Sequence, residues 1–143
     1  MFKLIVGHAG SGKSHKVAEL AVEAATQKRN VVIFVSDISS TVFHDHFLSK
    51  YEGKYNSYHM AVSNVPSLGV AVQRVVDGRT KPDVMFMDIH NNAVEDNRII
   101  SVLAEVYNID VYVVQQARDE SVPGTPQNFE IIDYAYKGDE DET

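Results

Sequence analysis

Gly7-His8-Ala9-Gly10-Ser11-Gly12-Lys13-Ser14 is the stretch of this 143-residue chain that decides the fold. It fills every fixed position of the pattern G-x-x-x-x-G-K-[ST], in which a glycine-rich loop joins a strand to a helix. The apolar run 2–6 predicts a buried strand before it, and the apolar spacing over 16–25 predicts the helix after it. Fewer than about 1% of chains of this length should contain the pattern by chance. The stretch therefore predicts a phosphate-binding loop.

Each residue type in the loop suits contact with phosphate. Glycines permit the turn angles and the close approach of backbone to an anion, and the helix that starts near Lys13 points its positive end at the same place. Lys13 supplies a compact cation for β- and γ-phosphates, and the Ser14 hydroxyl is a hard oxygen that Mg²⁺ accepts beside phosphate oxygens. We therefore expect a nucleoside triphosphate with Mg²⁺. The residues expected to contact it are Gly7, His8, Ala9, Gly10, Ser11, Gly12, Lys13, Ser14 and His15.

Length and composition favour one soluble domain. Hydrophobic residues make up 44% of the chain, which is enough to bury a core, and there is no cysteine for disulfides or thiolate-held zinc. The apolar runs are far shorter than the roughly 20 residues that span a bilayer. We expect a cytoplasmic protein without membrane contact, with a single domain over 1–138.

The net charge of -7 is concentrated at one end of the chain. Residues 119–143 hold eight acids and one base, whereas the remaining bases and acids cancel. Because the chain lacks a basic stripe, strong nucleic-acid binding by the monomer is not expected. The acidic run 139–143 is typical of a solvated, disordered tail.

Apolar runs alternate with helical patterns along the chain. The run 31–35 has no polar alternation, so this strand should be buried on both faces, as in a parallel sheet. Strands are also predicted over 55–62, 84–88, 111–114 and, at a sheet edge, 129–136; helices are predicted over 41–51, 66–77 and 94–107. This order predicts an α/β fold, a three-layer α/β/α sandwich with a mainly parallel sheet.

Two carboxylates follow predicted strands at the edge of the sheet where ligands bind in such folds. Asp88 ends the run 84–88 and should hold Mg²⁺ through a water, together with Ser14. Asp37 follows the run 31–35 and is the best-placed group to orient an attacking water, because Ile89 and not glutamate follows Asp88. The alternative for Asp37 is an N-cap of the next helix.

The order of these features resembles the P-loop NTPases of the RecA-like type, and the hexameric replicative helicases in particular. The resemblance covers 1–118: the phosphate loop, a second strand ending in an acid, Asp88, and then Leu103-Ala104-Glu105 leading to a strand that ends in Gln116. It implies a catalytic base at Asp37 and a γ-phosphate sensor at Gln116, with Gln115 as second choice, acting beside Lys13. Asp37 stands where the family has glutamate, so we expect slow ATP hydrolysis.

Two other functions remain open. Thymidine kinases share a phosphate loop on a related core and use a carboxylate to activate a hydroxyl, although they usually carry a structural zinc for which this chain has no cysteine. The third interpretation is a nucleotide-binding module that does not turn over and acts within a homo-oligomer or a larger assembly. Nucleoside-stimulated turnover distinguishes the kinase, and intact bound nucleotide distinguishes the module.

Overall fold

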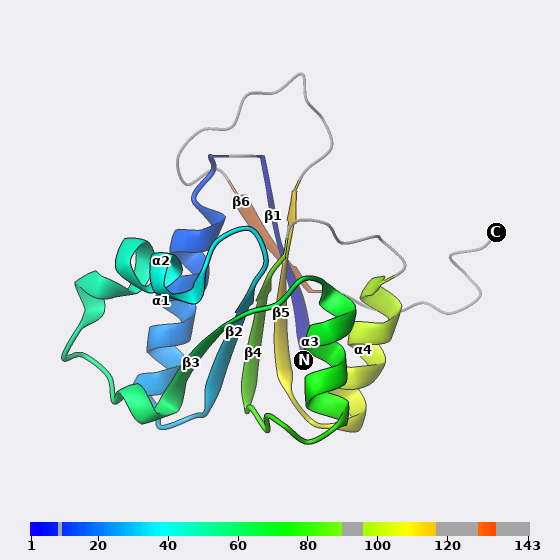
Figure 1. The fold of residues 1–143 in the computed structure, drawn as a ribbon. Coiled ribbons are helices and arrows are strands. Elements are labelled where there is room, and N and C mark those ends of the chain that lie inside the picture. Colours follow the sequence, from blue (N-terminus) through cyan, green and yellow to red (C-terminus); the bar gives the residue numbers. More distant parts are fainter. Residues whose placement is uncertain (9, 90–95, 117–128, 134–143) are drawn as a thin grey trace.

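The computed structural model of this chain describes residues 1–8, 10–89, 96–116 and 129–133. Its centre is a six-stranded sheet in the order β3-β2-β4-β5-β1-β6 (Figure 1). The strands are β1 (Phe2–Gly7), β2 (Val31–Val35), β3 (Met60–Asn64), β4 (Val84–Asp88), β5 (Asp110–Gln116) and β6 (Phe129–Asp133). The α-helices are α1 (Lys13–Thr26), α2 (Ser40–Phe43), α3 (Leu68–Val76) and α4 (Asp96–Val106).

Strands β1 to β5 pair with one another in parallel, and β6 joins the edge of the sheet antiparallel to β1. The α/β class, the mainly parallel sheet and the edge position of the last strand are therefore confirmed. β5 lies between β1 and β4, so the strand that leads into the loop and the strand that ends in Asp88 are not direct neighbours.

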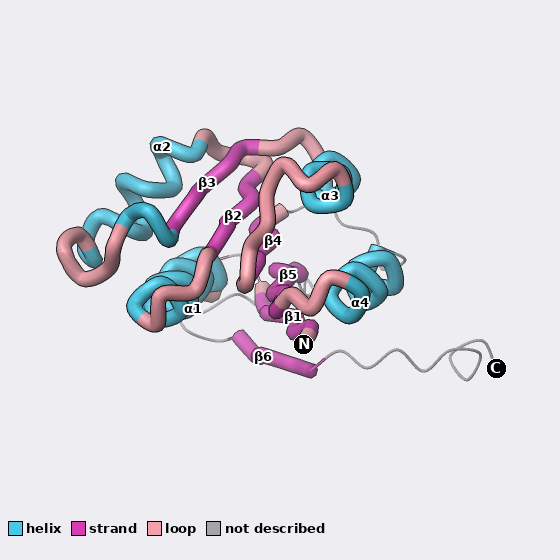
Figure 2. Tube along the Cα trace, turned by 90° about the horizontal axis from the view of Figure 1, so that it is seen from below, coloured by secondary structure: helices cyan, strands magenta, loops and turns pink. Residues whose placement is uncertain are grey.

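Helices cover both faces of the sheet, as the view from below shows (Figure 2). On one face, Val31, Ile33 and Val35 of β2 pack in a core with α1 and with Phe43 and Leu48. On the other face, Phe34 packs in a second core with α3 and α4. All five residues of β2 are buried, as expected for a strand covered on both sides.

The prediction of one regular α-helix over 41–51 is wrong. α2 ends at Phe43 and continues as a π-helical turn (His44–Leu48) and a 3₁₀ turn (Ser49–Tyr51). Phe43 and Leu48 are both fully buried, although they are five residues apart. Residues at that spacing lie on different sides of an α-helix with 3.6 residues per turn, whereas a π turn repeats near five residues. The wider turn therefore lets both side chains reach the core.

The predicted strand over 55–62 is also misplaced, because Ser57–His59 forms a 3₁₀ turn and the strand runs over Met60–Asn64. The side chain of Asn56 accepts a hydrogen bond from the backbone N–H of Tyr58 and so fixes the turn. Pairing with β2 begins only at Met60, opposite Val31. Residues 134–136 of the predicted last strand and the expected tail 139–143 lie outside the described residues.

Candidate functional site: a loop at the carboxyl edge of the sheet

The glycine-rich loop lies at the edge where the parallel strands end, and α1 begins directly after it (Figure 1). Gly10 and Gly12 have φ angles of 80° and 92°, which only glycine adopts readily. Gly12 is the N-cap of α1; no side chain caps this end, and the first turn holds no acidic residue. The 14-residue helix therefore directs its positive dipole end into the loop, and no acidic residue of its own first turn offsets it.

Lys13 lies beneath the loop with a side chain that is only 7% exposed. Its ammonium donates hydrogen bonds of 2.7 Å to the carbonyl oxygens of Gly7 and His8, and one of 3.4 Å to the Ser11 hydroxyl. Burial lowers the pKa of Lys13 below its ordinary value, and the nearby Asp88 carboxylate partly opposes this shift. The loop thus holds a desolvated cation against neutral acceptors, which favours an anionic ligand.

Ser14 and Asp88 meet at the same edge of the sheet, although 74 positions separate them in the sequence. The Ser14 hydroxyl donates to Asp88 Oδ2 over 2.5 Å, and Asp88 is 4% exposed at the last position of β4. A hydroxyl and a carboxylate are hard oxygen donors, and Mg²⁺ commonly binds proteins through one or two such groups while keeping its waters and substrate phosphates. The pair therefore fits the expected Mg²⁺ complex.

Asp37 is exposed two residues beyond β2, whose last residue Val35 pairs with Asp88. The Ser36 hydroxyl donates to Asp37 Oδ1 over 3.4 Å. The capping alternative for Asp37 is wrong, because the N-cap of α2 is Ser39, whose Oγ accepts from Val42 N at 3.1 Å. In the described part of the chain, Asp37 lines neither of the two pockets beside the loop.

Gln116 is the last residue of β5 and pairs with Gly7, where the loop begins. Gln115 instead accepts a hydrogen bond of 3.4 Å from Asn97, which is buried on α4. Between the two glutamines, the geometry places Gln116 at the loop. Gln116 also lines a pocket of about 350 Å³ together with Gly10, Ser11, Gly12, Lys13, Ser14, His15 and Phe47.

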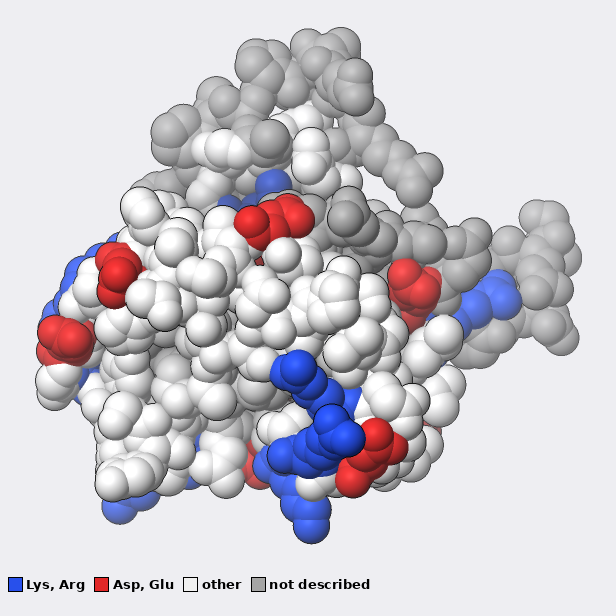
Figure 3. All heavy atoms as spheres, in the orientation of Figure 1, with Lys and Arg blue, Asp and Glu red and all other residues white. Residues whose placement is uncertain are grey.

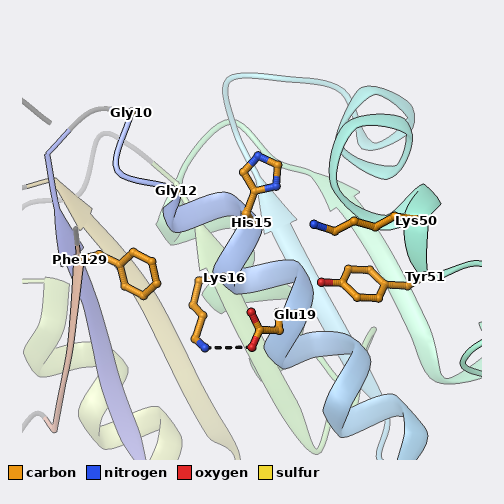
Figure 4. A pocket seen from close by; sticks show the side chains of 8 residues that line it. All are labelled: Gly10, Gly12, His15, Lys16, Glu19, Lys50, Tyr51 and Phe129. Carbon is orange, nitrogen blue, oxygen red and sulfur yellow. Dashed lines mark hydrogen bonds and ion pairs between the residues drawn. The ribbon is translucent and has the colours of Figure 1, made fainter. Parts of the chain in front are cut away.

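A second pocket of about 700 Å³ lies on the outer side of the start of α1 (Figure 4). It is lined by Gly10, Gly12, His15, Lys16, Glu19, Lys50, Tyr51 and Phe129. No sequence pattern indicated the residues at the sides of this pocket, nor Phe47, whose ring meets the His15 ring edge-on at a centroid distance of 4.7 Å. These aromatic residues come from distant segments, and no local pattern marks them as neighbours of the loop.

Some expected features lie outside the described residues, namely Ala9 of the loop and the segment 117–128 after Gln116. On the face shown in Figure 3, the largest group of basic side chains lies at the end of the molecule opposite the loop. None of the helices among the described residues is long and apolar enough to cross a membrane.

No family model matches the chain, and no curated protein matches it as a relative. The case for a function therefore rests on the chemistry and geometry of the loop and its neighbours.

Proposed function

We propose that this protein binds a nucleoside triphosphate, with ATP as the first candidate, as a Mg²⁺ complex and hydrolyses it slowly in the cytoplasm. The observation that carries the proposal is the convergence of three groups at one edge of the sheet. Lys13 is buried beside a loop whose glycines adopt left-handed backbone angles, and the Ser14 hydroxyl lies 2.5 Å from Asp88 Oδ2. A glycine-rich strand–helix turn with a purely structural role does not require a desolvated ammonium or a buried carboxylate at the same place.

Binding follows from the electrostatics of the loop. The three acceptors of Lys13 are neutral carbonyl and hydroxyl oxygens, which the oxygens of a phosphate can replace. With phosphate as the acceptor both partners are charged, so Coulomb attraction adds to the hydrogen bond that the ammonium already donates. The dipole of α1 acts in the same direction as Lys13, because its positive end faces the loop.

Mg²⁺ would bind at the same edge of the sheet. Ser14 and Asp88 are the residues that would hold Mg²⁺, and the ion would neutralise phosphate charge during phosphoryl transfer. Asp88 is buried and fixed by the Ser14 hydroxyl, so it is poised to accept hydrogen bonds from metal-bound water without rearrangement of the strand.

Hydrolysis requires a water oriented in line with the bond between the β- and γ-phosphates. The water oxygen forms a bond to the γ-phosphorus, the bond from that phosphorus to the bridging oxygen breaks, and the nucleoside diphosphate leaves with the electron pair. We assign Asp37 to orient the water and accept its proton, and Gln116 to donate a hydrogen bond to the γ-phosphate. Asp37 is exposed and stands outside the pocket that Gln116 lines, so turnover should be slow.

The test is titration calorimetry with Mg-ATP and Mg-GTP, followed by analysis of the nucleotide after incubation. Binding with slow release of nucleoside diphosphate and inorganic phosphate supports the proposal, and absence of binding at millimolar nucleotide contradicts it. Turnover that begins only when a nucleoside is added would show a phosphotransferase. Intact nucleotide after long incubation would show a binding module.

A further inference from the structure

The larger pocket beside the loop adjoins the smaller pocket, with which it shares part of its lining. Both are bordered by Gly10, Gly12 and His15, while Lys13, Ser14 and Gln116 line only the smaller one. The loop and the first turn of α1 therefore form a shared border between two compartments. A ligand that occupied both would cross this border.

The metal-binding pair fixes the direction in which a triphosphate would cross. Ser14, which donates a hydrogen bond to Asp88, lines the smaller compartment together with Lys13, so the β- and γ-phosphates belong there. The α-phosphate and the group attached to it can then extend over the shared border. The larger pocket is the space on that side, and its volume of about 700 Å³ is in the range of small-molecule sites.

The walls of the larger pocket have the chemistry of a nucleoside site. Phe129 lies directly opposite Gly7 in the pairing of β6 with β1, so the sheet itself holds this ring beside the loop. On the other side, Tyr51 and Lys50 point toward α1, and the Lys50 ammonium lies 5.2 Å from the Tyr51 ring centre (Figure 4). Between the walls, Lys16 and Glu19 of α1 form an ion pair of 3.1 Å. Aromatic faces stack on any base, and charged groups suit the polar edges of a base or the ribose hydroxyls.

We propose that this pocket binds the nucleoside of the triphosphate, with the base stacked on Phe129 and the open side closed by Tyr51 and Lys50. The inference rests on the proposed function, because it takes the phosphate direction from the metal-binding pair. The same direction argues against a phosphoryl acceptor in this pocket, since an acceptor hydroxyl must reach the γ-phosphate in the other compartment. With this pocket, the protein binds the nucleoside as well as the triphosphate of its ligand.

The experiment compares Mg-ATP with Mg-tripolyphosphate, which carries the phosphates without a nucleoside. Titration calorimetry measures both affinities for the wild type, for Phe129→Leu, and for Ile132→Ala as a matched control on the exposed part of the same strand. The wild type should bind ATP more tightly than tripolyphosphate. Phe129→Leu should lower ATP affinity about tenfold and leave tripolyphosphate affinity unchanged, whereas Ile132→Ala should change neither. Retained tripolyphosphate binding also shows that the variant is folded.

The outcomes separate this inference from the function on which it rests. If the wild type binds tripolyphosphate and ATP equally well, or if Phe129→Leu leaves ATP affinity intact, the nucleoside assignment is overturned while the phosphate site stands. If Phe129→Leu weakens both ligands equally, Phe129 supports the loop and not the base, and the assignment is again overturned. If the wild type binds neither ligand, the proposed function fails and the inference fails with it. Tyr51→Leu provides a second variant, for which a loss confined to ATP is also expected.

Discussion

The hydroxyl of Ser14 lies 2.5 Å from the Oδ2 of Asp88, although 74 positions separate the two residues. One belongs to the first turn of α1 and the other ends β4, and β5 runs between β4 and the strand that feeds the loop. The sheet therefore brings a hydroxyl and a carboxylate together at its carboxyl edge, where the positive end of α1 also points. The following variants test what this edge does.

Asp88→Asn should remove most of the Mg²⁺ dependence of ATP affinity. The amide keeps the size of the side chain and can still accept a hydrogen bond from Ser14, but it no longer carries the charge that attracts the hydrated cation. ATP affinity measured over a series of Mg²⁺ concentrations checks this. If the affinity of Asp88→Asn for ATP still increases with Mg²⁺ as in the wild type, the metal assignment is wrong.

Lys13→Ala should weaken Mg-ATP binding about 10- to 100-fold, because a hydrogen bond from a charged group contributes about 1.5–3 kcal/mol. Since the ammonium donates its hydrogen bonds to oxygens of Gly7, His8 and Ser11 in the loop itself, the variant should keep the wild-type circular dichroism spectrum. Lys54→Ala, at an exposed position outside both pockets, is the matched control and should bind normally. Equal affinities for Lys13→Ala and Lys54→Ala would contradict a phosphate role for Lys13.

Asp37→Asn should lower kcat about 10²–10⁴-fold and leave ATP affinity unchanged, because it removes the charge that orients and deprotonates water. Ser39 caps α2, so the thermal midpoint should also be unchanged. Single-turnover hydrolysis beside a thermal melt measures both quantities, with Asp45→Asn as the control carboxylate on the adjacent helical segment. A normal rate in Asp37→Asn would place the base elsewhere.

Gln116→Ala should slow hydrolysis about 10²-fold, as expected when one donor to a developing charge is lost, with little effect on stability. Gln115→Ala should show the opposite pattern, because Gln115 accepts from the buried Asn97 and lies away from the loop pocket. Rates and melting curves of the two variants together decide which glutamine acts. If Gln115→Ala is the slower enzyme, the assignment is reversed.

The lowered pKa of Lys13 predicts a pH dependence of stability in the absence of nucleotide. Because the folded pKa lies below the unfolded value of 10.5, the unfolded chain binds more protons between the two, and the free energy of unfolding contributed by this residue increases with pH over that interval. Lys13→Met lacks this contribution. Urea unfolding of both proteins from pH 7 to pH 10.5 should therefore show a wild-type gain relative to Lys13→Met, and parallel curves would contradict it.

The local sequence was sufficient to predict most of the helices and strands and to recognise the pattern of the loop. The strands β1, β2 and β4 and the helices α1, α3 and α4 are predicted close to their observed bounds, since burial imposes a period that neighbouring residues reveal. The prediction of a regular helix failed at α2. There Phe43 and Leu48 are five residues apart, and both are buried in the core. The loop pattern could be recognised in the sequence because its glycines and Lys13 lie within one short segment of the chain.

The sequence by itself determined the phosphate-loop pattern, the apolar strands and the placing of Asp88 and Gln116 at strand ends. Only the tertiary structure decided that Ser14 contacts Asp88, that Ser39 and not Asp37 caps α2, and that Phe129 lies beside Gly7. These contacts depend on strand order and register, which are set by the packing of the whole sheet. Side-chain periodicity along one segment reports which face is buried, but it carries no information on which distant segment will cover that face.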